Sequence, residues 1–236
     1  MRHGQAGTRD AYDSLSELGK RQARLLGEHF VSQGMQFASV YTGTLLRQKQ
    51  TAEEICQAFT DAKICFPALS ADPAWDEFDL GRVYRDIAPP LCAEDPEFRR
   101  EYEDMLEQVR ISDSTPTARI HRKWLPCDTK VVEAWIRGRY PYSGESWEQF
   151  RERVEACRLK MGDGQRRENI LVVTSATPIA IWAGFSLEIF DERLMRLAGV
   201  LHNASYSVVR LRNGQLRLFT FNAVPHLAAP GLRTHR

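Results

Sequence analysis

The 236-residue sequence lacks a long hydrophobic run and has almost no excess charge of either sign. Its best candidate for a membrane span, Ala176–Phe185, is interrupted by Thr177 and Pro178 and falls short of the roughly 18 apolar residues that a span needs. Lys and Arg total 32 against 31 Asp and Glu, which leaves a formal net charge of +1. The sequence therefore predicts neither a membrane partner nor a nucleic-acid partner.

Cysteine is also scarce, and no two cysteines form a C-x-x-C pair. The five residues are odd in number and widely spaced, which predicts reduced thiols and argues against a disulfide framework or a zinc cluster. No apolar stretch typical of a secretory signal follows Met1. Together these features predict a cytoplasmic protein. The five are Cys56, Cys65, Cys92, Cys127 and Cys157.

Several well-known site motifs are missing. The sequence contains no G-x-x-x-x-G-K-[ST] phosphate loop, no G-x-G-x-x-G, no H-E-x-x-H and no G-x-S-x-G. The histidines outside the N-terminal segment show no metal-ligand spacing, so no metal site is predicted. These are His29, His121, His202, His226 and His235.

Helical and strand patterns alternate in the first third of the chain. Ser16 has the position of an N-cap before a helical pattern that Gly34 ends. Residues 37–41 read as a buried strand, and a second helix is predicted from about residue 45 to 59. This alternation favours a parallel sheet flanked by helices.

The middle of the chain, about 85–142, changes character and is predicted to be a helical insertion. A charge-rich amphipathic helix is expected over 97–110, followed by a polar loop at 112–117 and another helix over 131–139. The basic cluster 119–123 is most simply a solvated face, with attraction of a phosphorylated substrate as the alternative. Trp124 and Trp135 are expected to pack in the core of the insertion.

The last third again indicates strands and helices. Ser146 with Gln149 forms a capping-box pattern at the start of a helix that 162–164 breaks. Residues 169–174 are the clearest buried strand, leading into a helix at Pro178. Strands are expected over 206–211 and 216–221, joined by Asn213-Gly214 as a hairpin, before a loosely ordered tail.

Four segments carry the polar residues that chemistry requires. They are Arg2-His3-Gly4, residues 42–52 around Arg47, residues 75–81 around Glu77, and residues 173–178, where a parallel strand meets a helix. Their order and spacing resemble the histidine phosphatase superfamily, branch 1, which is phosphoglycerate mutase-like. The resemblance covers about 2–82 and 143–227, with further matching stretches at 15–19, 144–147 and 203–205.

This resemblance implies an α/β fold, a three-layer αβα sandwich with a mostly parallel central sheet. A single domain is expected over 1–227, in which the insertion 85–142, unmatched by the resemblance, forms a lid over the strand ends, and 228–236 form a tail. The implied partner is a small phosphorylated substrate, and no metal or other cofactor is implied.

By the same resemblance, His3 is the nucleophile that forms a phosphohistidine, and Arg2 and Arg47 bind the phosphoryl oxygens. Such roles suit the residue types, because an imidazole nitrogen can attack phosphorus and a guanidinium group matches phosphate geometry. The alternative for Arg47 is a solvated helix residue in an i,i+4 ion pair. Both interpretations stay open at this point.

Glu77 matches the general acid of the family, which protonates the leaving oxygen and then deprotonates water. Its neighbours Asp76 and Asp79 are alternative candidates for that role. An ordinary solvated loop carboxylate is the remaining interpretation of Glu77.

The sequence departs from the family in two places. Ser175 stands where most members have a second histidine that contacts the phosphate, and a hydroxyl donates a hydrogen bond without supplying positive charge. The R-H-G motif of the family follows the central strand, whereas only Met1 precedes Arg2 here. We hypothesise that the natural chain continues upstream with about five or six apolar residues, a typical strand length.

The predicted function is hydrolysis of a phosphate monoester without a metal, through a phosphohistidine. Phosphoglycerate mutase-type phosphoryl transfer is one alternative, although the mutases have Asn where this chain has Arg9. A catalytically weak protein that binds a phosphorylated ligand is the other, suggested by Ser175. The sequence does not indicate the substrate or the oligomeric state.

Overall fold

The computed structural model describes residues 1–7, 13–112, 125–161, 168–213 and 215–235. The chain divides into two compact units, one formed by Met1–Glu77 with Arg153–Arg236 and the other by Phe78–Glu152. The second unit contains the whole predicted insertion, 85–142. The basic cluster 119–123, Trp124, His121, Arg9 and the helix break at 162–164 lie outside the described residues, as does the loop at 112–117 beyond Ser112.

A parallel sheet forms the centre of the first unit. Its strand order is β2 (Leu69–Ala71), β1 (Ser39–Thr42) and β3 (Ile170–Val173), and Val40 lies opposite both Leu69 and Leu171. Strands β1 and β3 confirm the predicted buried strands, with β1 beginning two residues later than expected. The sequence analysis did not identify β2, because this strand has only three residues and all three are exposed.

The N-terminal segment extends this sheet beside β3. Arg2 forms a parallel bridge with Thr174, and the His3 backbone N–H donates to the Thr174 carbonyl at 2.9 Å. On its other side, Arg2 N–H donates to the Ser205 carbonyl and Ala204 N–H donates to the His3 carbonyl, each at 3.0 Å. His3 therefore has its backbone held on both sides at the carboxyl end of β3.

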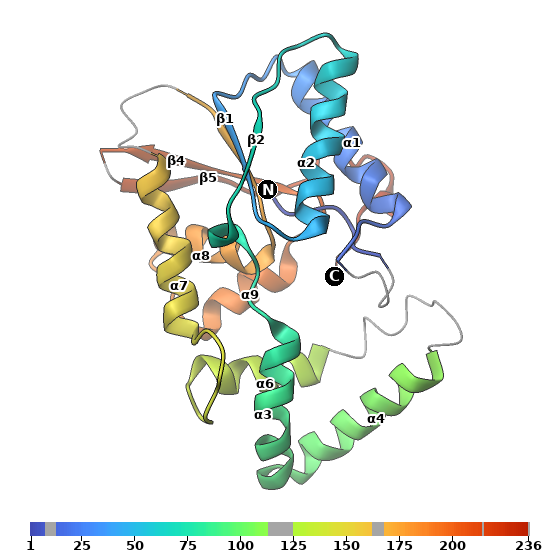
Figure 1. Cartoon of the computed structure of the whole chain (residues 1–236), viewed down its shortest axis with the longest axis vertical. Coiled ribbons are helices and arrows are strands. Elements are labelled where there is room, and N and C mark those ends of the chain that lie inside the picture. The colour runs from blue at the N-terminus through green and yellow to red at the C-terminus, as the bar shows by residue number, and fades with distance from the viewer. Residues whose placement is uncertain (8–12, 113–124, 162–167, 214, 236) are drawn as a thin grey trace. The chain divides into compact units, whose positions relative to one another are not determined.

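One face of the sheet is covered by α1 (Glu17–Ser32) and α2 (Leu46–Asp61), which lie side by side in Figure 1. Ser16 caps α1 as predicted, because its side chain accepts from Gly19 N–H. The two helices approach closely at Gly27, where a Cβ would lie 2.7 Å from that of Ala58. The core between helices and sheet consists of Met1, Leu26, Phe30, Val40, Ala52, Ile55, Phe59, Leu171 and Val173.

Helices α8 (Ala176–Leu187) and α9 (Glu192–Val200) complete a three-layer α/β/α sandwich. Helix α8 contacts α9 and the hairpin of β4 (Tyr206–Arg212) and β5 (Gln215–Ala223), which is antiparallel as predicted. Being covered from several sides explains why α8 is apolar all round. It starts two residues before the predicted Pro178. Short 3₁₀ turns occur at η2 (Pro73–Trp75), η3 (Cys157–Met161) and η4 (Pro230–Leu232).

The second unit is helical, with α3 (Leu80–Glu94), α4 (Pro96–Ser112), α6 (Leu125–Ile136) and the start of α7 (Trp147–Ala156). Trp135 is 3% exposed and its ring contacts those of Phe78, Trp147 and Phe150, which confirms its predicted core position. The capping box is confirmed: Gln149 N–H donates to Ser146 Oγ, and Ser146 N–H donates to Gln149 Oε1. Helix α3 was not predicted, and it contains Pro89 and Pro90.

The tail differs from the prediction of loose order. The Gln22 side-chain amide donates to the Leu232 carbonyl and to Thr234 Oγ1, both at 2.8 Å, and Asn203 N–H donates to the Thr234 carbonyl at 2.8 Å. Gln22 is completely buried, so its amide needs these acceptors. Long-range hydrogen bonding of this kind cannot be read from the composition of the tail.

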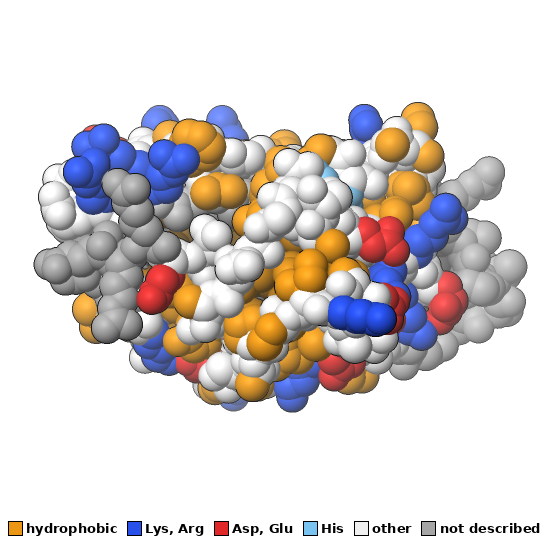
Figure 2. Space-filling view, turned by 90° about the horizontal axis from the view of Figure 1, so that it is seen from above, with side chains coloured by type: hydrophobic (Ala, Val, Ile, Leu, Met, Phe, Trp, Pro, Cys, Tyr) orange, Lys and Arg blue, Asp and Glu red, His pale blue; other side chains and the backbone are white. Residues whose placement is uncertain are grey.

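The surface mixes both signs of charge. Figure 2 shows a face on which basic and acidic side chains both lie among hydrophobic ones, as the near-equal counts of 32 and 31 lead us to expect. Among the described residues, no helix combines the length and the apolar character that crossing a bilayer requires. All five cysteines are described, and each has a free thiol.

His226 makes the stability of the first unit depend on pH. Burial, with a smaller contribution from the nearby His29, lowers the pKa of His226 to about 4. The unfolded-state pKa of histidine is about 6.5, so the unfolded chain binds the proton more tightly. The stability that neutral His226 provides is therefore fully present above about pH 6.5 and is lost as the pH falls toward 4.

The variant His226→Phe keeps an aromatic ring beside His29 and Tyr206 but cannot be protonated. Between pH 7 and pH 4.5, we expect its free energy of unfolding to fall by about 1–2 kcal/mol less than that of the wild type, a range reduced for partial exposure. Urea unfolding at several pH values measures both curves. Parallel curves would show that His226 does not carry this pH dependence.

Candidate active site

His3 has a defined tautomer because of its two neighbours. Its ring Nδ1 is 2.7 Å from the Gly4 carbonyl, which can only accept, so Nδ1 carries the proton. Its Nε2 is 3.3 Å from Arg47 Nε, which can only donate, so Nε2 presents a lone pair. The residue is 5% exposed. This arrangement leaves a neutral imidazole whose unprotonated nitrogen faces Arg47.

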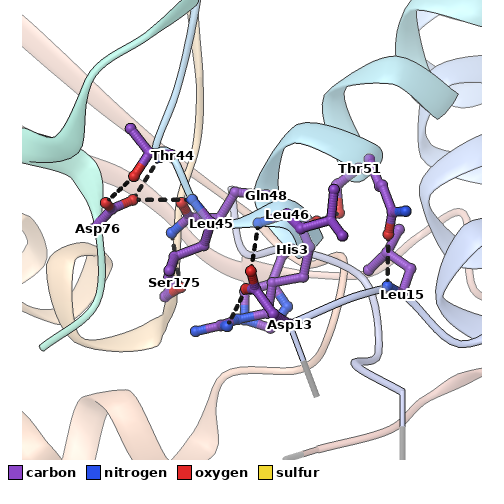
Figure 3. Close-up of polar contacts among 12 residues, drawn as sticks. His3, Asp13, Leu15, Thr44, Leu45, Leu46, Gln48, Thr51, Asp76 and Ser175 are labelled. Atoms are coloured by element: carbon purple, nitrogen blue, oxygen red, sulfur yellow. Dashed lines mark hydrogen bonds and ion pairs between the residues drawn. The ribbon is translucent and has the colours of Figure 1, made fainter. Parts of the chain in front are cut away.

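Arg47 lies in the first turn of α2 and connects His3 with Asp13. Its Nη1 donates to Asp13 Oδ1 at 2.9 Å, and Asp13 Oδ2 accepts from Leu46 N–H at 3.1 Å (Figure 3). Arg47 is only 8% exposed. The alternative interpretation of Arg47 as a solvated helix residue is therefore wrong. An internal carboxylate therefore already takes the place that an external anion would occupy at this helix N-terminus.

Asp76 anchors the loop before α2. Its Oδ1 accepts from Thr44 N–H at 2.6 Å and from Leu45 N–H at 3.3 Å, and its Oδ2 accepts from the Thr44 hydroxyl. Leu45 is the N-cap of α2 and has no side-chain cap bond. Asp76 therefore accepts from the backbone that enters the helix, while Asp13 accepts from its first residue, Leu46. The contacts of Asp76 indicate a structural role.

Glu77 lies at the N-terminus of α8. Its Oε2 accepts from Thr177 N–H, the second residue of the helix, at 3.1 Å. The preceding loop is held by Arg153, whose Nη1 donates to the carbonyls of Pro73, Ala74 and Asp76 at 2.9, 3.0 and 3.3 Å. These bonds fix the backbone that leads into Glu77.

Asp79, the other alternative to Glu77, has a structural role at a different helix. Asp79 is the N-cap of α3 and its Oδ1 accepts from Arg82 N–H at 2.9 Å. Of the three neighbouring acidic residues, Glu77 is thus the one whose carboxylate contacts α8.

Ser175 follows β3 and is 1% exposed. Its Oγ accepts from Gln48 Nε2 at 3.0 Å, and Gln48 also donates to the Trp75 carbonyl at 3.4 Å. The neighbouring Thr174 hydroxyl donates to the same carbonyl. Ser175, the Glu77 loop and the first turn of α2 are therefore joined by hydrogen bonds.

Arg2 is 5% exposed, and one guanidinium nitrogen donates to the Leu201 carbonyl at the end of α9. Its backbone is paired with Thr174 beside His3. The described contacts thus bring His3, Arg47 and the Ser175–Glu77 region together, and they direct Arg2 toward α9. Phosphate binding by Arg2 remains a prediction.

Several supporting residues escaped the sequence analysis. Thr51 Oγ1 accepts from Gly4 N–H at 3.0 Å and donates to the Arg47 carbonyl at 2.7 Å. Gly4 also packs against Gly19, where a Cβ would lie 2.4 Å from the carbonyl oxygen. Thr51 belongs to the segment 42–52 that was singled out, but only the fold shows that it contacts Gly4.

The described residues contain no group of three or more His, Cys, Asp or Glu side chains that could hold a metal ion. The two histidines nearest each other, His202 and His235, have ring centroids 4.0 Å apart. The Arg47 guanidinium group contacts His3 directly and brings positive charge to the ring.

Asp76→Ala removes three hydrogen bonds at the start of α2, and we expect the free energy of unfolding to fall by about 1–3 kcal/mol. Asp76→Asn keeps one acceptor oxygen and is expected to lose less. Urea unfolding followed by tryptophan fluorescence measures both variants. A wild-type midpoint for Asp76→Ala would contradict the proposed anchoring.

Comparison with known proteins adds independent information. A family model described as the histidine phosphatase superfamily (branch 1) matches residues 1–134 and 115–224. Serine/threonine-protein phosphatase Pgam5, mitochondrial, of Caenorhabditis elegans is 21% identical over 149 residues, 62% of this chain and 51% of that protein. The chain thus spans about half the length of this relative.

Solved structures show the same fold. Bacillus stearothermophilus YhfR is 17% identical, with a TM-score of 0.63 over 96% of this chain and 97% of that one. Phosphoglycerate mutase from Bacillus anthracis str. Sterne is also 17% identical, with a TM-score of 0.60 over 96% and 92% of the two chains. These structures show the fold, and the family model, which matches most of the sequence, shows that the chain belongs to branch 1 of the histidine phosphatase superfamily.

Proposed function

We propose that this protein hydrolyses a phosphate monoester without a metal ion, through a phosphohistidine at His3. The observation that carries the proposal is the orientation of the His3 ring. Nδ1 donates to the Gly4 carbonyl, so the lone pair of Nε2 is directed to the side where Arg47 lies. A nitrogen nucleophile beside a guanidinium group suits attack on a phosphoryl centre, whose oxygens the cation stabilises.

In the first step, His3 Nε2 forms a bond to phosphorus as the ester P–O bond breaks. Glu77, in its protonated form, gives its proton to the leaving oxygen. The phosphoryl oxygens displace Asp13 from Arg47 and Leu46 N–H, both of which already bind a carboxylate. The end of this step is an alcohol and phosphohistidine.

In the second step, a water oxygen bonds to phosphorus as the P–N bond breaks. The Glu77 carboxylate takes a proton from that water, which restores the acid form for the next cycle. Phosphate leaves, and His3 returns to a neutral ring with Nδ1 protonated. All protons and the phosphoryl group are accounted for in these two steps without a metal or an external base.

Family membership and the phosphatase name of the Caenorhabditis elegans relative support this reaction class. We propose a small phosphorylated molecule as substrate and the cytoplasm as the location, as the sequence predicted. Substrate choice depends on residues outside the reaction centre, because differences in affinity between substrates come from contacts with their non-reacting parts.

A second candidate function is binding of a phosphorylated ligand without turnover. Ser175 favours it, because this fully buried hydroxyl supplies no positive charge where most family members have histidine. Loss of one cationic donor costs about 2–4 kcal/mol of transition-state stabilisation, by analogy with oxyanion-hole deletions. A ligand with the same charge could still bind through Arg47.

The first test is hydrolysis of p-nitrophenyl phosphate in the presence of EDTA. We expect turnover by the wild type and a loss of about 10³-fold or more in His3→Ala, because the variant lacks the imidazole that forms the proposed intermediate. His29→Gln changes a histidine on α1 within an aromatic cluster and is the matched control. Phosphate protection against thermal unfolding with no turnover supports the second candidate instead.

The proposed role of Glu77 as general acid is tested by comparing substrates with different leaving groups. Glu77→Gln should reduce hydrolysis of an alkyl phosphate by about 10²–10⁴-fold, because a poor leaving group needs the proton. For p-nitrophenyl phosphate, whose leaving group is weakly basic, the loss should be smaller.

Asp79→Asn is the matched control for Glu77→Gln, and we expect it to leave the ratio of the two rates unchanged. A change of that ratio in Asp79→Asn, with none in Glu77→Gln, would assign the acid to Asp79.

A further inference from the structure

Ser175 occupies an N-cap position but does not cap its helix. An N-cap serine ordinarily accepts from the N–H of the second or third helical residue. Here Thr177 N–H, the second residue of α8, donates to Glu77 Oε2 at 3.1 Å, and Ser175 makes no capping bond. The hydroxyl of Ser175 is therefore available for another task.

Gln48 determines which way that hydroxyl points. Its Nε2 donates to Ser175 Oγ at 3.0 Å and to the Trp75 carbonyl at 3.4 Å. The carbonyl can only accept, so the nitrogen of the amide must face this side. Ser175 Oγ thus acts as an acceptor toward Gln48, and its single proton is directed elsewhere. No acceptor for that proton occurs among the described residues.

Ser175 and His3 follow residues that are paired in the sheet. Arg2 and Thr174 pair as neighbours in parallel, so the residues after them, His3 and Ser175, leave the sheet at the same end. Paired strands lie about 4.8 Å apart. Gln48 directly follows Arg47, whose Nε contacts His3, and Gln48 itself contacts Ser175 (Figure 3).

Gln48 is not explained by stability alone. The side chain is completely buried, and its Oε1 has no hydrogen-bond partner among the described residues. Burying an unpaired acceptor is unfavourable, and an apolar side chain of similar size would avoid this cost. What the amide adds over such a side chain is its donor group, and that group contacts Ser175.

We propose that Gln48 is a positioning residue, which donates to Ser175 Oγ and thereby directs the Ser175 hydroxyl proton toward a phosphoryl oxygen bound at His3. This inference rests on the proposed function. The pair supplies a neutral, oriented donor at the position where most family members have histidine. Gln48 acts only through Ser175 and does not contact the substrate.

The test is a double-mutant cycle read out as affinity for inorganic phosphate by calorimetry, with kcat and KM for p-nitrophenyl phosphate alongside. The proteins are the wild type, Gln48→Met, Ser175→Ala and the double variant. We expect each single substitution to weaken phosphate binding about three- to tenfold. The double variant should bind no more weakly than Ser175→Ala, because Gln48 has nothing left to orient.

Two further variants control for poor folding of Gln48→Met and for the Gln-to-Met change itself. Gln48→Asn retains the amide but is one methylene shorter, so it should lose the contact with Ser175 and weaken phosphate binding like Gln48→Met, even if Gln48→Met folds poorly. Gln57→Met makes the same change at an exposed position of α2 and should bind phosphate like the wild type. Thermal unfolding of each variant reports on folding separately.

Two results would overturn the inference alone, with phosphate binding and turnover by the wild type intact. One is unchanged phosphate affinity in Gln48→Met and Gln48→Asn. The other is an equal loss from Gln48→Met with and without Ser175→Ala, which would show that Gln48 acts through the Trp75 carbonyl or through packing. A wild type that neither binds phosphate nor turns over overturns the proposed function and this inference together.

Discussion

The backbone pairing of Arg2 and His3 with Thr174 is the constraint on which the rest of the site depends. It holds the N-terminal segment between β3 and Ala204–Ser205, so that His3 and Ser175 emerge at one end of the sheet. Because main-chain hydrogen bonds set this position, the fold places the His3 backbone and only the orientation of its ring is left to side chains. Gly4 and Arg47 then determine that orientation.

Two helices begin beside this strand end, and each brings the positive end of its dipole to the site. Carboxylates meet both of them: Asp13 and Asp76 at the start of α2, and Glu77 at the start of α8. The three acidic groups have different roles, since Asp76 anchors a loop and Asp13 pairs with Arg47. The same electrostatics that satisfy these helix ends make the site suited to a phosphate group.

In the proposed function, Ser175 in place of a histidine changes how a phosphate would be held. The guanidinium group of Arg47 carries positive charge next to His3, while Gln48 and Ser175 provide neutral donors. Neutral donors depend on orientation much more than a charge does, because a misdirected hydroxyl contributes nothing. The proposed role of Gln48 gives a reason for burying an amide whose Oε1 has no partner in the described part of the chain, because its nitrogen orients the Ser175 hydroxyl.

The sequence alone determined the strongly patterned elements, which include the Ser16 cap, the buried strand 169–174, the Ser146–Gln149 capping box and the family-level motifs. Local pattern suffices there, because period and capping are properties of neighbouring residues. Tertiary structure decided what depends on distant contacts: the exposed strand β2, the ordered tail bound to Gln22, and the partners of Asp13 and Gln48. Asp13 is 34 positions from Arg47 and Gln48 is 127 from Ser175, so only chain folding could bring each pair together.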